Sequence, residues 1–328
     1  MRSTKTIIVL AATGALALGA AACGDDDNES GGTGGGGEKV SGTIAVDGSS
    51  TVFPFVQAAA EQFQGENPDV RITVGESGTG GGFEKFCAGE TDISNASRPI
   101  KDDEEVPVCK KNGVAYSEVQ IANDGIAVAT NKDLKIDCMT TAELKKLWNK
   151  GSTVKSYNEV NPKFPNQEVS LFGPGTDSGT FDFFTDEING EEGATRKDYQ
   201  PSEDDNVLVQ GVSGDQGGLG YFGFSYYEQN QDKLNLVGVD SGSGCIKPSK
   251  EAISDGSYKP LSRPLFVYPS AKSLAKPQVK AFMDYMLANQ GQIAEAAQIV
   301  PLTPEQITKA EAALKQAEGG ATGATTTP

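Results

Sequence analysis

Short apolar strands alternate with helices along this chain, and that alternation limits the fold more than any other feature of the sequence. Residues 44–46 and 70–74 carry the every-second-residue apolar pattern of strands. Between them, Phe55, Ala59 and Phe63 recur every four residues, as on one face of a helix. Because strands that alternate with helices usually form a parallel sheet covered by helices, we expect an α/β fold built on a parallel sheet.

The chain is long enough for two globular lobes. It has 328 residues, of which 37% are hydrophobic, so two separate cores of ordinary size can form. Two apolar runs that lie far apart in the sequence, residues 126–129 and 265–268, are interpreted as crossover segments between the lobes. We expect lobe 1 to comprise residues 40–123 and 265–318, and lobe 2 to comprise residues 124–264.

The amino terminus has the pattern of a bacterial lipoprotein. Two basic residues precede an apolar run that ends in three alanines directly before Cys23. Residues 1–22 are therefore expected to be a signal peptide, and Cys23 the lipid (palmitate) attachment site. The alternative is an ordinary signal peptide with a cysteine near its cleavage site. Residues 23–39 are polar and rich in glycine, which predicts a flexible tether, and residues 319–328 predict a disordered tail.

The charge balance excludes one class of partner. The net charge is −17, and removal of residues 1–22 leaves 26 basic against 45 acidic residues, a net charge of −19. Binding along a nucleic acid requires clustered Lys and Arg, and the sequence shows no such stripe. Small anions stay possible, because local dipoles and not the distant net charge govern a closed site.

Apart from Cys23, the chain has an even number of cysteines, as exported proteins with disulfides do. Three pairings are possible, and we favour the one whose first bridge closes a short local loop. That pairing joins Cys87 to Cys109 and Cys138 to Cys245.

The chain contains no histidine. This removes the usual general base, so Ser-His-Asp and Cys-His catalysis are excluded. Without histidine or a C-x-x-C spacing, a zinc site is a poor alternative to the disulfides. We expect a protein that is not an enzyme and that holds no metal or cofactor.

Three segments place Ser or Thr and Gly just after an expected strand and just before an expected helix. The first segment is residues 48–52 (GSSTV), the second is residues 76–83 (ESGTGGGF), and the third is residues 177–184 (DSGTFDFF). The first turn of a helix has unpaired N–H groups and a partial positive charge, which attract anions. Taken singly, each segment is more simply a helix cap and a turn. Together they predict an anion site, although none of them matches a nucleotide-binding motif.

Arg98 is the expected cationic group of that site. It follows the strand pattern of residues 92–95, where an open α/β sheet delivers side chains to its crevice. A guanidinium can bind two oxygens of an oxyanion at once. The alternative is a surface ion pair with Asp102 or Asp103.

Four stretches together resemble a known family over roughly residues 41–270. They are DGSSTVFPFVQAAAEQF, GESGTGGGFEKFCAGETDISNASRPI, FGPGTDSGTFDFF and NVLVQGVSGDQGGLGYFGFSYY. The family is the PstS-type phosphate-binding protein of the bacterial high-affinity phosphate ABC transporter. The resemblance implies a type II periplasmic-binding-protein fold, in which two α/β lobes joined by two crossovers close on a ligand cleft. It also implies that the C-terminal helices complete lobe 1.

The function implied is the capture of inorganic phosphate outside the cytoplasm and its delivery to a membrane permease. The protein would be a monomer, anchored to the cell membrane through lipidated Cys23. Carried over by motif, the phosphate ligands come from the three segments and the stretch after the third strand. They are Ser50, Thr51, Val52 (through its N–H), Ser77, Gly78, Thr79, Ser97, Arg98, Asp177, Ser178, Gly179 and Thr180.

The sequence departs from the family pattern at two positions. Well-known members have an arginine a few residues before the third segment and an aspartate at the position of Ser97, whereas Pro174 and a serine stand here. We therefore expect Arg98 to supply the compensating charge. Asp177 is our choice of acceptor for the phosphate proton, ahead of Asp47 and Glu76.

Three other functions remain to be tested. A receptor for sulfate or molybdate is the nearest, a secreted phosphatase is less favoured for want of a base or metal set, and an adhesion or structural lipoprotein would bind no small ligand.

Overall fold

A computed structural model describes residues 40–318. The predictions for the signal peptide, for Cys23, for the tether and for the tail after residue 318 lie outside the described residues. None of the helices within residues 40–318 is both long enough and apolar enough to cross a membrane.

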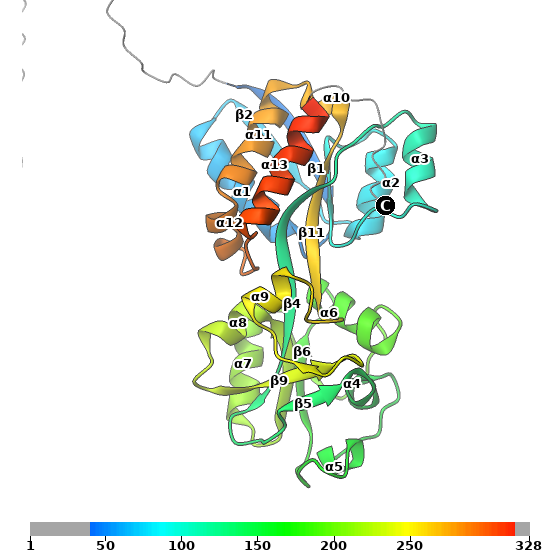
Figure 1. The fold of residues 1–328 in the computed structure, drawn as a ribbon, viewed down its shortest axis with the longest axis vertical. Coiled ribbons are helices and arrows are strands. Elements are labelled where there is room, and N and C mark those ends of the chain that lie inside the picture. The colour runs from blue at the N-terminus through cyan, green and yellow to red at the C-terminus, as the bar shows by residue number, and fades with distance from the viewer. Residues whose placement is uncertain (1–39, 319–328) are drawn as a thin grey trace, which may run out of the picture. The chain divides into compact units, whose positions relative to one another are not determined.

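Two segments distant in sequence build the first half of the structure, which we call lobe 1. Figure 1 shows α1 and the C-terminal helices on one side of its strands, with α2 and α3 on the other. The elements from the first segment are β1 (Gly42–Gly48), α1 (Phe53–Glu66), β2 (Val70–Val74), α2 (Gly78–Cys87), β3 (Ile93–Ala96) and α3 (Glu105–Lys111). Those from the second are α10 (Ala271–Leu274), α11 (Pro277–Ala288), α12 (Gln290–Ala296) and α13 (Pro304–Glu318).

The residues between these segments build lobe 2. Its first elements are β5 (Cys138–Thr140), α4 (Thr141–Trp148), α5 (Tyr157–Val160), β6 (Ser170–Pro174), α6 (Gly179–Phe184) and the π-helix η1 (Thr185–Asn189). Then follow β7 (Gln200–Ser202), α7 (Asp205–Gly214), β8 (Gly218–Gly223), α8 (Phe224–Gln229), β9 (Leu234–Asp240), β10 (Cys245–Ile246) and α9 (Lys250–Ser254).

Two long strands, β4 (Val119–Asn131) and β11 (Ser262–Pro269), connect the lobes and pair with each other. The sheet order is β2-β1-β3-β11-β4-β8-β6-β7, and β9 pairs with β4, β5 and β10. Pairs such as β1 with β2 and β6 with β8 are parallel, but every pair that involves β4 or β11 is antiparallel. The predicted parallel sheet is therefore a mixed one, because β4 and β11 run antiparallel to each other and to the strands beside them.

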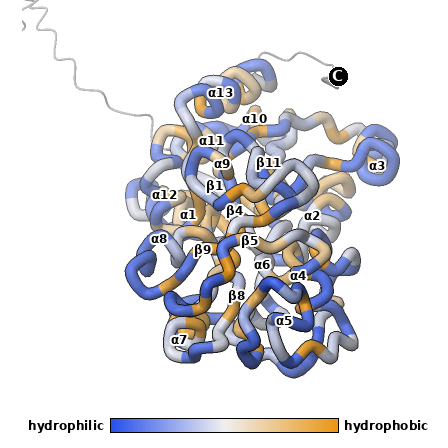
Figure 2. The backbone as a smooth tube through the Cα atoms, turned by 60° about the horizontal axis from the view of Figure 1, so that its bottom comes forward, coloured by the Kyte–Doolittle hydropathy of each residue, from blue (hydrophilic) through white to orange (hydrophobic). Residues whose placement is uncertain are grey.

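Each lobe has its own hydrophobic core. The lobe 1 core is made by residues of β1, α1 and β2 together with residues of α11, α12 and α13. The lobe 2 core runs through β4, β8 and β9, with Trp148 among its fully buried side chains. In Figure 2 the hydrophobic stretches gather in the interior around β1 and β4, and the outer turns are hydrophilic.

Local sequence signals explain where several helices begin. Phe55, Ala59 and Phe63 are buried on one face of α1, as expected. Thr140 caps α4 in a capping box with Glu143, which matches the sequence pattern. The start of α2 differs from the expectation: the sequence pattern predicts a short helix from Phe83 to about Ala88, whereas the helix begins five residues earlier, at Gly78, and includes the glycines.

Close packing explains why α2 tolerates those glycines. A Cβ atom on Gly82 would lie 2.5 Å from the Cα of Gly48, which itself has a φ of +145°. A Cβ atom on Gly75 would lie 2.2 Å from Oδ2 of Asp47. Here glycine allows α2 and the loop before it to lie directly on β1, and this packing offsets the usual cost of glycine in a helix.

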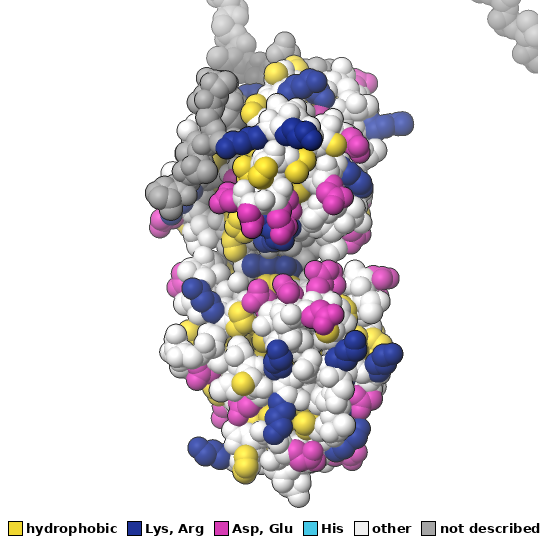
Figure 3. Space-filling view, turned by 90° about the vertical axis from the view of Figure 1, so that its right-hand side faces the viewer, with side chains coloured by type: hydrophobic (Ala, Val, Ile, Leu, Met, Phe, Trp, Pro, Cys, Tyr) yellow, Lys and Arg dark blue, Asp and Glu magenta, His cyan; other side chains and the backbone are white. Residues whose placement is uncertain are grey.

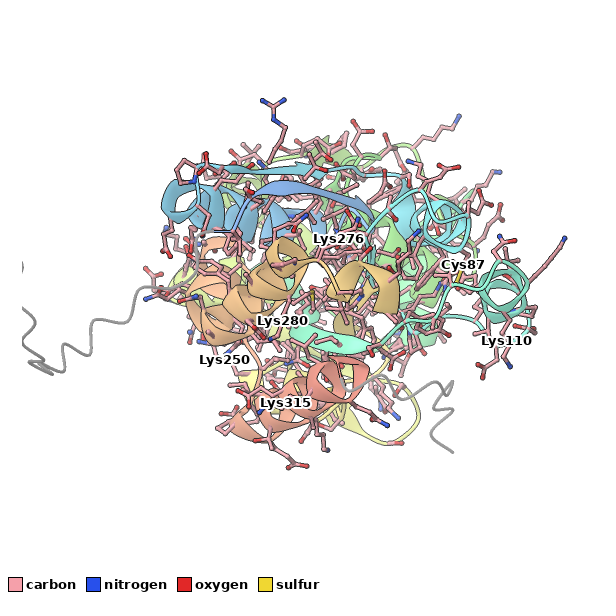
Figure 4. All side chains as sticks on the ribbon, turned by 90° about the horizontal axis from the view of Figure 1, so that it is seen from above. Cys87, Lys110, Lys250, Lys276, Lys280 and Lys315 are labelled. Atoms are coloured by element: carbon pink, nitrogen blue, oxygen red, sulfur yellow. A yellow bond between two sulfur atoms is a disulfide. The ribbon has the colours of Figure 1, made fainter. Side chains whose placement is uncertain are left out.

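The structure contains two disulfides, Cys87–Cys109 and Cys138–Cys245, which is the pairing favoured from the sequence. The first joins the end of α2 to α3 (Figure 4), and the second joins β5 to β10. The two bridges close loops of different length, with sequence separations of 22 and 107 residues.

We expect the longer loop to contribute more stability. The loss of chain entropy in the unfolded state gives about 3.4 kcal/mol for the Cys87–Cys109 bridge and about 4.8 kcal/mol for the Cys138–Cys245 bridge. Urea unfolding of the two double Cys→Ser variants measures the difference. A Cys138→Ser/Cys245→Ser protein as stable as wild type would show that this bridge does not constrain the unfolded chain.

Candidate functional site

A cavity of about 370 Å³ lies where the lobes meet, and residues from both lobes line it. Ser50 and Thr51 line it from the first segment, before α1, and residues 177–180 line it from the third segment, at the start of α6. Asp205 and Gly223 add the starts of α7 and α8. The starts of α1, α6, α7 and α8 therefore lie around one region.

The first and third segments are in direct contact across the lobes. A Cβ atom on Gly179 would lie 2.2 Å from Oγ1 of Thr51, 2.7 Å from Oγ of Ser50 and 2.9 Å from the backbone nitrogen of Thr51. The hydroxyl of Ser178 accepts a hydrogen bond from the N–H of Thr180 at 3.2 Å and caps α6. Glycine at position 179 is thus required for the lobes to approach this closely.

Val52 lies differently from the expectation. Its N–H group donates to the carbonyl oxygen of Ser49 at 3.2 Å, in the turn that leads into α1. Its side chain is fully buried. The amide that we expected to bind an anion therefore already has a partner within the turn.

The second segment meets the cavity through one residue. Glu76 lines the cavity, and its charge and that of Asp177 interact. Ser77 instead donates a hydrogen bond to Oδ1 of Asp47, and the hydroxyl of Thr79 lies 3.1 Å from that of Ser97. Gly78 has a φ of +76°, a left-handed conformation that favours glycine. The structure thus brings together the first and third segments, while the hydroxyls of the second are paired within lobe 1.

Arg98 is held outside the cavity lining. Its two terminal nitrogens donate to the carboxylate of Glu105 at 2.9 Å and 2.7 Å, a two-point ion pair. The guanidinium also lies 5.7 Å from the centre of the Phe83 ring. The alternative given by the sequence is an ion pair with Asp102 or Asp103. Arg98 does form an ion pair, but its partner is Glu105, at the start of α3.

A different arginine lies between the segments. Nη2 of Arg263, on β11, donates to Oγ1 of Thr51 at 2.8 Å and to the carbonyl oxygen of Gly179 at 3.2 Å. Nε donates to Oδ2 of Asp124 at 3.2 Å, and the guanidinium lies 3.8 Å from the centre of the Phe183 ring. The Arg263 side chain is 14% exposed, so its charge is largely removed from water.

Sequence reasoning missed Arg263. The available signal was an arginine directly before a proline at the start of an apolar strand pattern, RPLFVYP, where the chain passes between lobes. A charged side chain at the start of a buried strand requires a partner, and only the fold supplies Asp124 from the neighbouring strand.

The cavity lining is acidic. It includes Glu76, Asp124, Asp177, Glu203 and Asp205, and within residues 40–318 no three His, Cys, Asp or Glu side chains cluster closely enough to hold a metal ion. Burial, and then the charge of Asp177, raises the pKa of Glu76. Figure 3 shows Lys and Arg side chains at the level where the lobes meet, with Asp and Glu side chains on either side.

Asp47 is in a different environment from the lining carboxylates. Burial would raise its pKa, but hydrogen bonds from Lys85 and Ser77 outweigh burial and hold the pKa below its usual value. The Lys85 Nζ atom lies 2.7 Å from Oδ2 of Asp47. Asp47 is therefore an ionised, paired carboxylate within lobe 1, and it does not line the cavity.

We expect Asp205 to make the ligand-free protein less stable at neutral pH. Burial, followed by the charges of its acidic neighbours, raises its pKa to about 6, although the N–H of Gly223 opposes this. A raised pKa means that the stabilisation is complete in acid and is lost as pH rises through about 6. Asp205→Asn should add on the order of 2 kcal/mol at about pH 7.5 and roughly half of that at about pH 5, because the stabilisation is lost between about pH 4 and pH 6.

Urea unfolding at the two pH values measures the effect of Asp205→Asn. The control is Asp133→Asn, which removes an exposed carboxylate. Equal changes for the two variants at both pH values would contradict the expectation.

Comparison with known proteins places the chain in a family. It matches the PBP superfamily domain over residues 33–290. The chain belongs to this superfamily. It is 42% identical over 279 residues to "Phosphate-binding protein PstS" of Staphylococcus saprophyticus, which covers 84% of this chain and 85% of that protein. It is 46% identical over 270 residues to "Protein SphX" of Synechococcus elongatus, which covers 81% and 80%.

A solved structure agrees with this assignment. The present structure superposes on the crystal structure of "a possible phosphate binding protein from Planctomyces limnophilus" with a TM-score of 0.80, and the two sequences are 43% identical. The match covers 85% of this chain and 99% of the other. The predicted periplasmic-binding-protein fold and the predicted PstS-type family are thereby confirmed.

Proposed function

We propose that this protein captures inorganic phosphate outside the cytoplasm and passes it to the permease of an ABC transporter. The observation that carries the proposal is that the first and third segments line one cavity from opposite lobes. Amide groups at the starts of α1 and α6, together with neutral hydroxyls, can replace the water around an oxyanion. The printed names of the PstS relatives and the Planctomyces protein support phosphate as the ion.

The proposed ligands fall into two groups. The first group lines the cavity and comprises Ser50, Thr51, Asp177, Ser178, Gly179 and Thr180. The second group belongs to lobe 1 and does not line the cavity. Apart from Gly78, its members would have to exchange their present partners for the ion. The group comprises Val52, Ser77, Gly78, Thr79, Ser97 and Arg98. We further propose residues 40–123 with 265–318, and residues 124–264, as the two lobes that close on it.

The acidic lining supports phosphate over sulfate. Phosphate near neutral pH carries at least one proton that it can donate, whereas sulfate carries none. A lining carboxylate such as Asp177 can accept that proton, but it repels an ion that brings only oxygen lone pairs. Asp177 is exposed in the structure, so the mismatch would cost several kcal/mol once the lobes close on the ion and remove water from this carboxylate.

Anchoring and delivery complete the proposal. Cys23 would carry the lipid, residues 23–39 would tether the lobes to the membrane, and the protein would act as a monomeric receptor that is not an enzyme. Labelling of cells with a radioactive fatty acid tests the anchor: wild type should be labelled and Cys23→Ser should not. Label retained in the variant would assign the lipid elsewhere.

Calorimetric titration tests phosphate capture. Wild-type protein, unfolded and refolded to remove bound ions, should bind one phosphate per chain. In a thermal unfolding assay, phosphate at 100 times its dissociation constant should add about 2.7 kcal/mol of stability. No heat and no stabilisation with phosphate would reject the proposal, and binding of sulfate or molybdate alone would redirect it.

Arg98→Ala tests whether Arg98 leaves Glu105 to bind the ion. A direct contact between the guanidinium and phosphate predicts at least a tenfold loss of affinity, since a charge-assisted hydrogen bond contributes about 1.5 to 3 kcal/mol. Titration of the variant with phosphate measures it. An unchanged dissociation constant would leave Arg98 as the partner of Glu105 only.

A further inference from the structure

Arg263 contacts both faces of the cavity through a single nitrogen atom. Nη2 is the atom that donates both to Thr51 in lobe 1 and to Gly179 in lobe 2. Its Nε donates to Asp124, on the other connecting strand. The arginine therefore lies at the junction of the first segment, the third segment and the strands that join the lobes.

We propose that Arg263 is a positioning residue for the bound anion: it ties the first and third segments together and makes the Thr51 hydroxyl a donor to the ligand. The inference rests on the proposed function and adds a residue to it. Arg263 acts through Thr51 and Gly179, and it need not touch the ion.

The bond with Arg263 determines what the Thr51 hydroxyl can offer to a ligand. A threonine hydroxyl has one hydrogen to donate and two lone pairs that accept. A guanidinium can only donate, so the oxygen of Thr51 is the acceptor in its bond with Arg263. The hydrogen of Thr51 is then left for another partner. Because Thr51 lines the cavity, a ligand beside it that is rich in acceptors, such as an oxyanion, would receive that hydrogen.

The Arg263 guanidinium makes several contacts at once that depend on its flat, forked shape. Nε and Nη2 donate in different directions, to Asp124 and to the two segments, while the flat face lies on the ring of Phe183. A lysine ammonium is a single point charge without a flat face, so it cannot make these contacts together. The site therefore requires arginine and not merely a positive charge.

The ion pair between Arg263 and Asp124 is largely shielded from water. Asp124 is 7% exposed and Arg263 is 14% exposed, so both charges have lost most of their water. Buried ion pairs of this kind are often no more stabilising than apolar residues of similar volume. A role in stability alone thus gives little reason for this pair, whereas a role in holding two binding segments does.

A double-mutant cycle tests the proposal. Phosphate affinity is measured by calorimetry for wild type, Arg263→Met, Thr51→Val and the double variant. We expect Arg263→Met to lower the affinity for phosphate at least about 30-fold. The double variant should bind phosphate within about threefold of Arg263→Met, because Arg263 acts through Thr51. Arg71→Met removes an exposed arginine on β2 and should stay within about twofold of wild type. The proposal would be overturned if the affinity losses of the two single variants add up in the double variant, or if Arg263→Met binds phosphate as wild type does.

A measurement without phosphate separates this proposal from the proposed function. Hydrogen exchange in phosphate-free protein should become faster in Arg263→Met for peptides that cover residues 48–56 and 176–184, and should be unchanged in α11. Unchanged exchange in both segments would overturn the tie, whether or not the protein binds phosphate. If Arg263→Met does not fold, Arg263→Lys takes its place: we expect about a tenfold loss of affinity, and wild-type affinity would overturn the need for a guanidinium.

Discussion

Gly179→Ala should lower the affinity for phosphate at least about 100-fold, equivalent to about 2.8 kcal/mol, and leave the stability of the ligand-free protein nearly unchanged. The added carbon would lie 2.2 Å from Oγ1 of Thr51 and 2.9 Å from its backbone nitrogen. Real Cβ atoms do not approach other atoms this closely, and a backbone nitrogen cannot rotate away. The clash lies between the lobes, so the variant can relieve it by keeping them apart, at the expense of the closed site.

Calorimetric titration and urea unfolding of the same samples separate the two effects of Gly179→Ala. The matched control is Gly65→Ala near the end of α1, where an added Cβ meets nothing within 4 Å. The control should bind phosphate as wild type does and gain about 0.5 to 1 kcal/mol of stability. Wild-type affinity in Gly179→Ala would show that the contact between the segments is not needed for binding.

Discrimination against sulfate is expected to be the largest single effect. The lining places Glu76, Asp124 and Asp177 around the proposed site, so an ion without a proton meets acceptor groups that it cannot satisfy. A mismatch of several kcal/mol corresponds to a ratio of affinities on the order of 10³ or more. Competition titrations of wild type with both ions measure the ratio.

The carboxylate that carries the discrimination can then be identified. Asp177→Asn should lose affinity for phosphate and gain it for sulfate, because an amide can donate a hydrogen bond where a carboxylate can only accept. Glu76→Gln serves as the comparison, since it removes a second lining carboxylate. If neither variant changes the ratio, these two residues do not accept the phosphate proton.

Local patterns in the sequence were sufficient for the elements that depend on them. The spacing of Phe55, Ala59 and Phe63 gives α1, and Thr140 with Glu143 gives the start of α4. The direction of the connecting strands could not be predicted, because pairing of β4 with β11 depends on residues more than a hundred positions apart. The early start of α2 was missed for a related reason: its glycines weaken the helix locally, and contact with β1 overrides that preference.

The candidate site was predictable only where it depends on local sequence signals. The first and third segments can be found in the sequence because a hydroxyl and a glycine before a helix form a local signal. The cation cannot, since Arg263 and its partner Thr51 are 212 residues apart. Arg98 has the expected chemistry, but Glu105, only seven residues away, supplies a partner that satisfies its charge.

A crystal structure of the phosphate complex would test most directly the claim that helix starts from both lobes bind the anion. We expect tetrahedral density between the first and third segments, within hydrogen-bonding distance of the hydroxyl of Thr51 and of amides at the start of α6. Phosphate found on exposed lysines only, or bound to one lobe with the two segments apart, would contradict the claim.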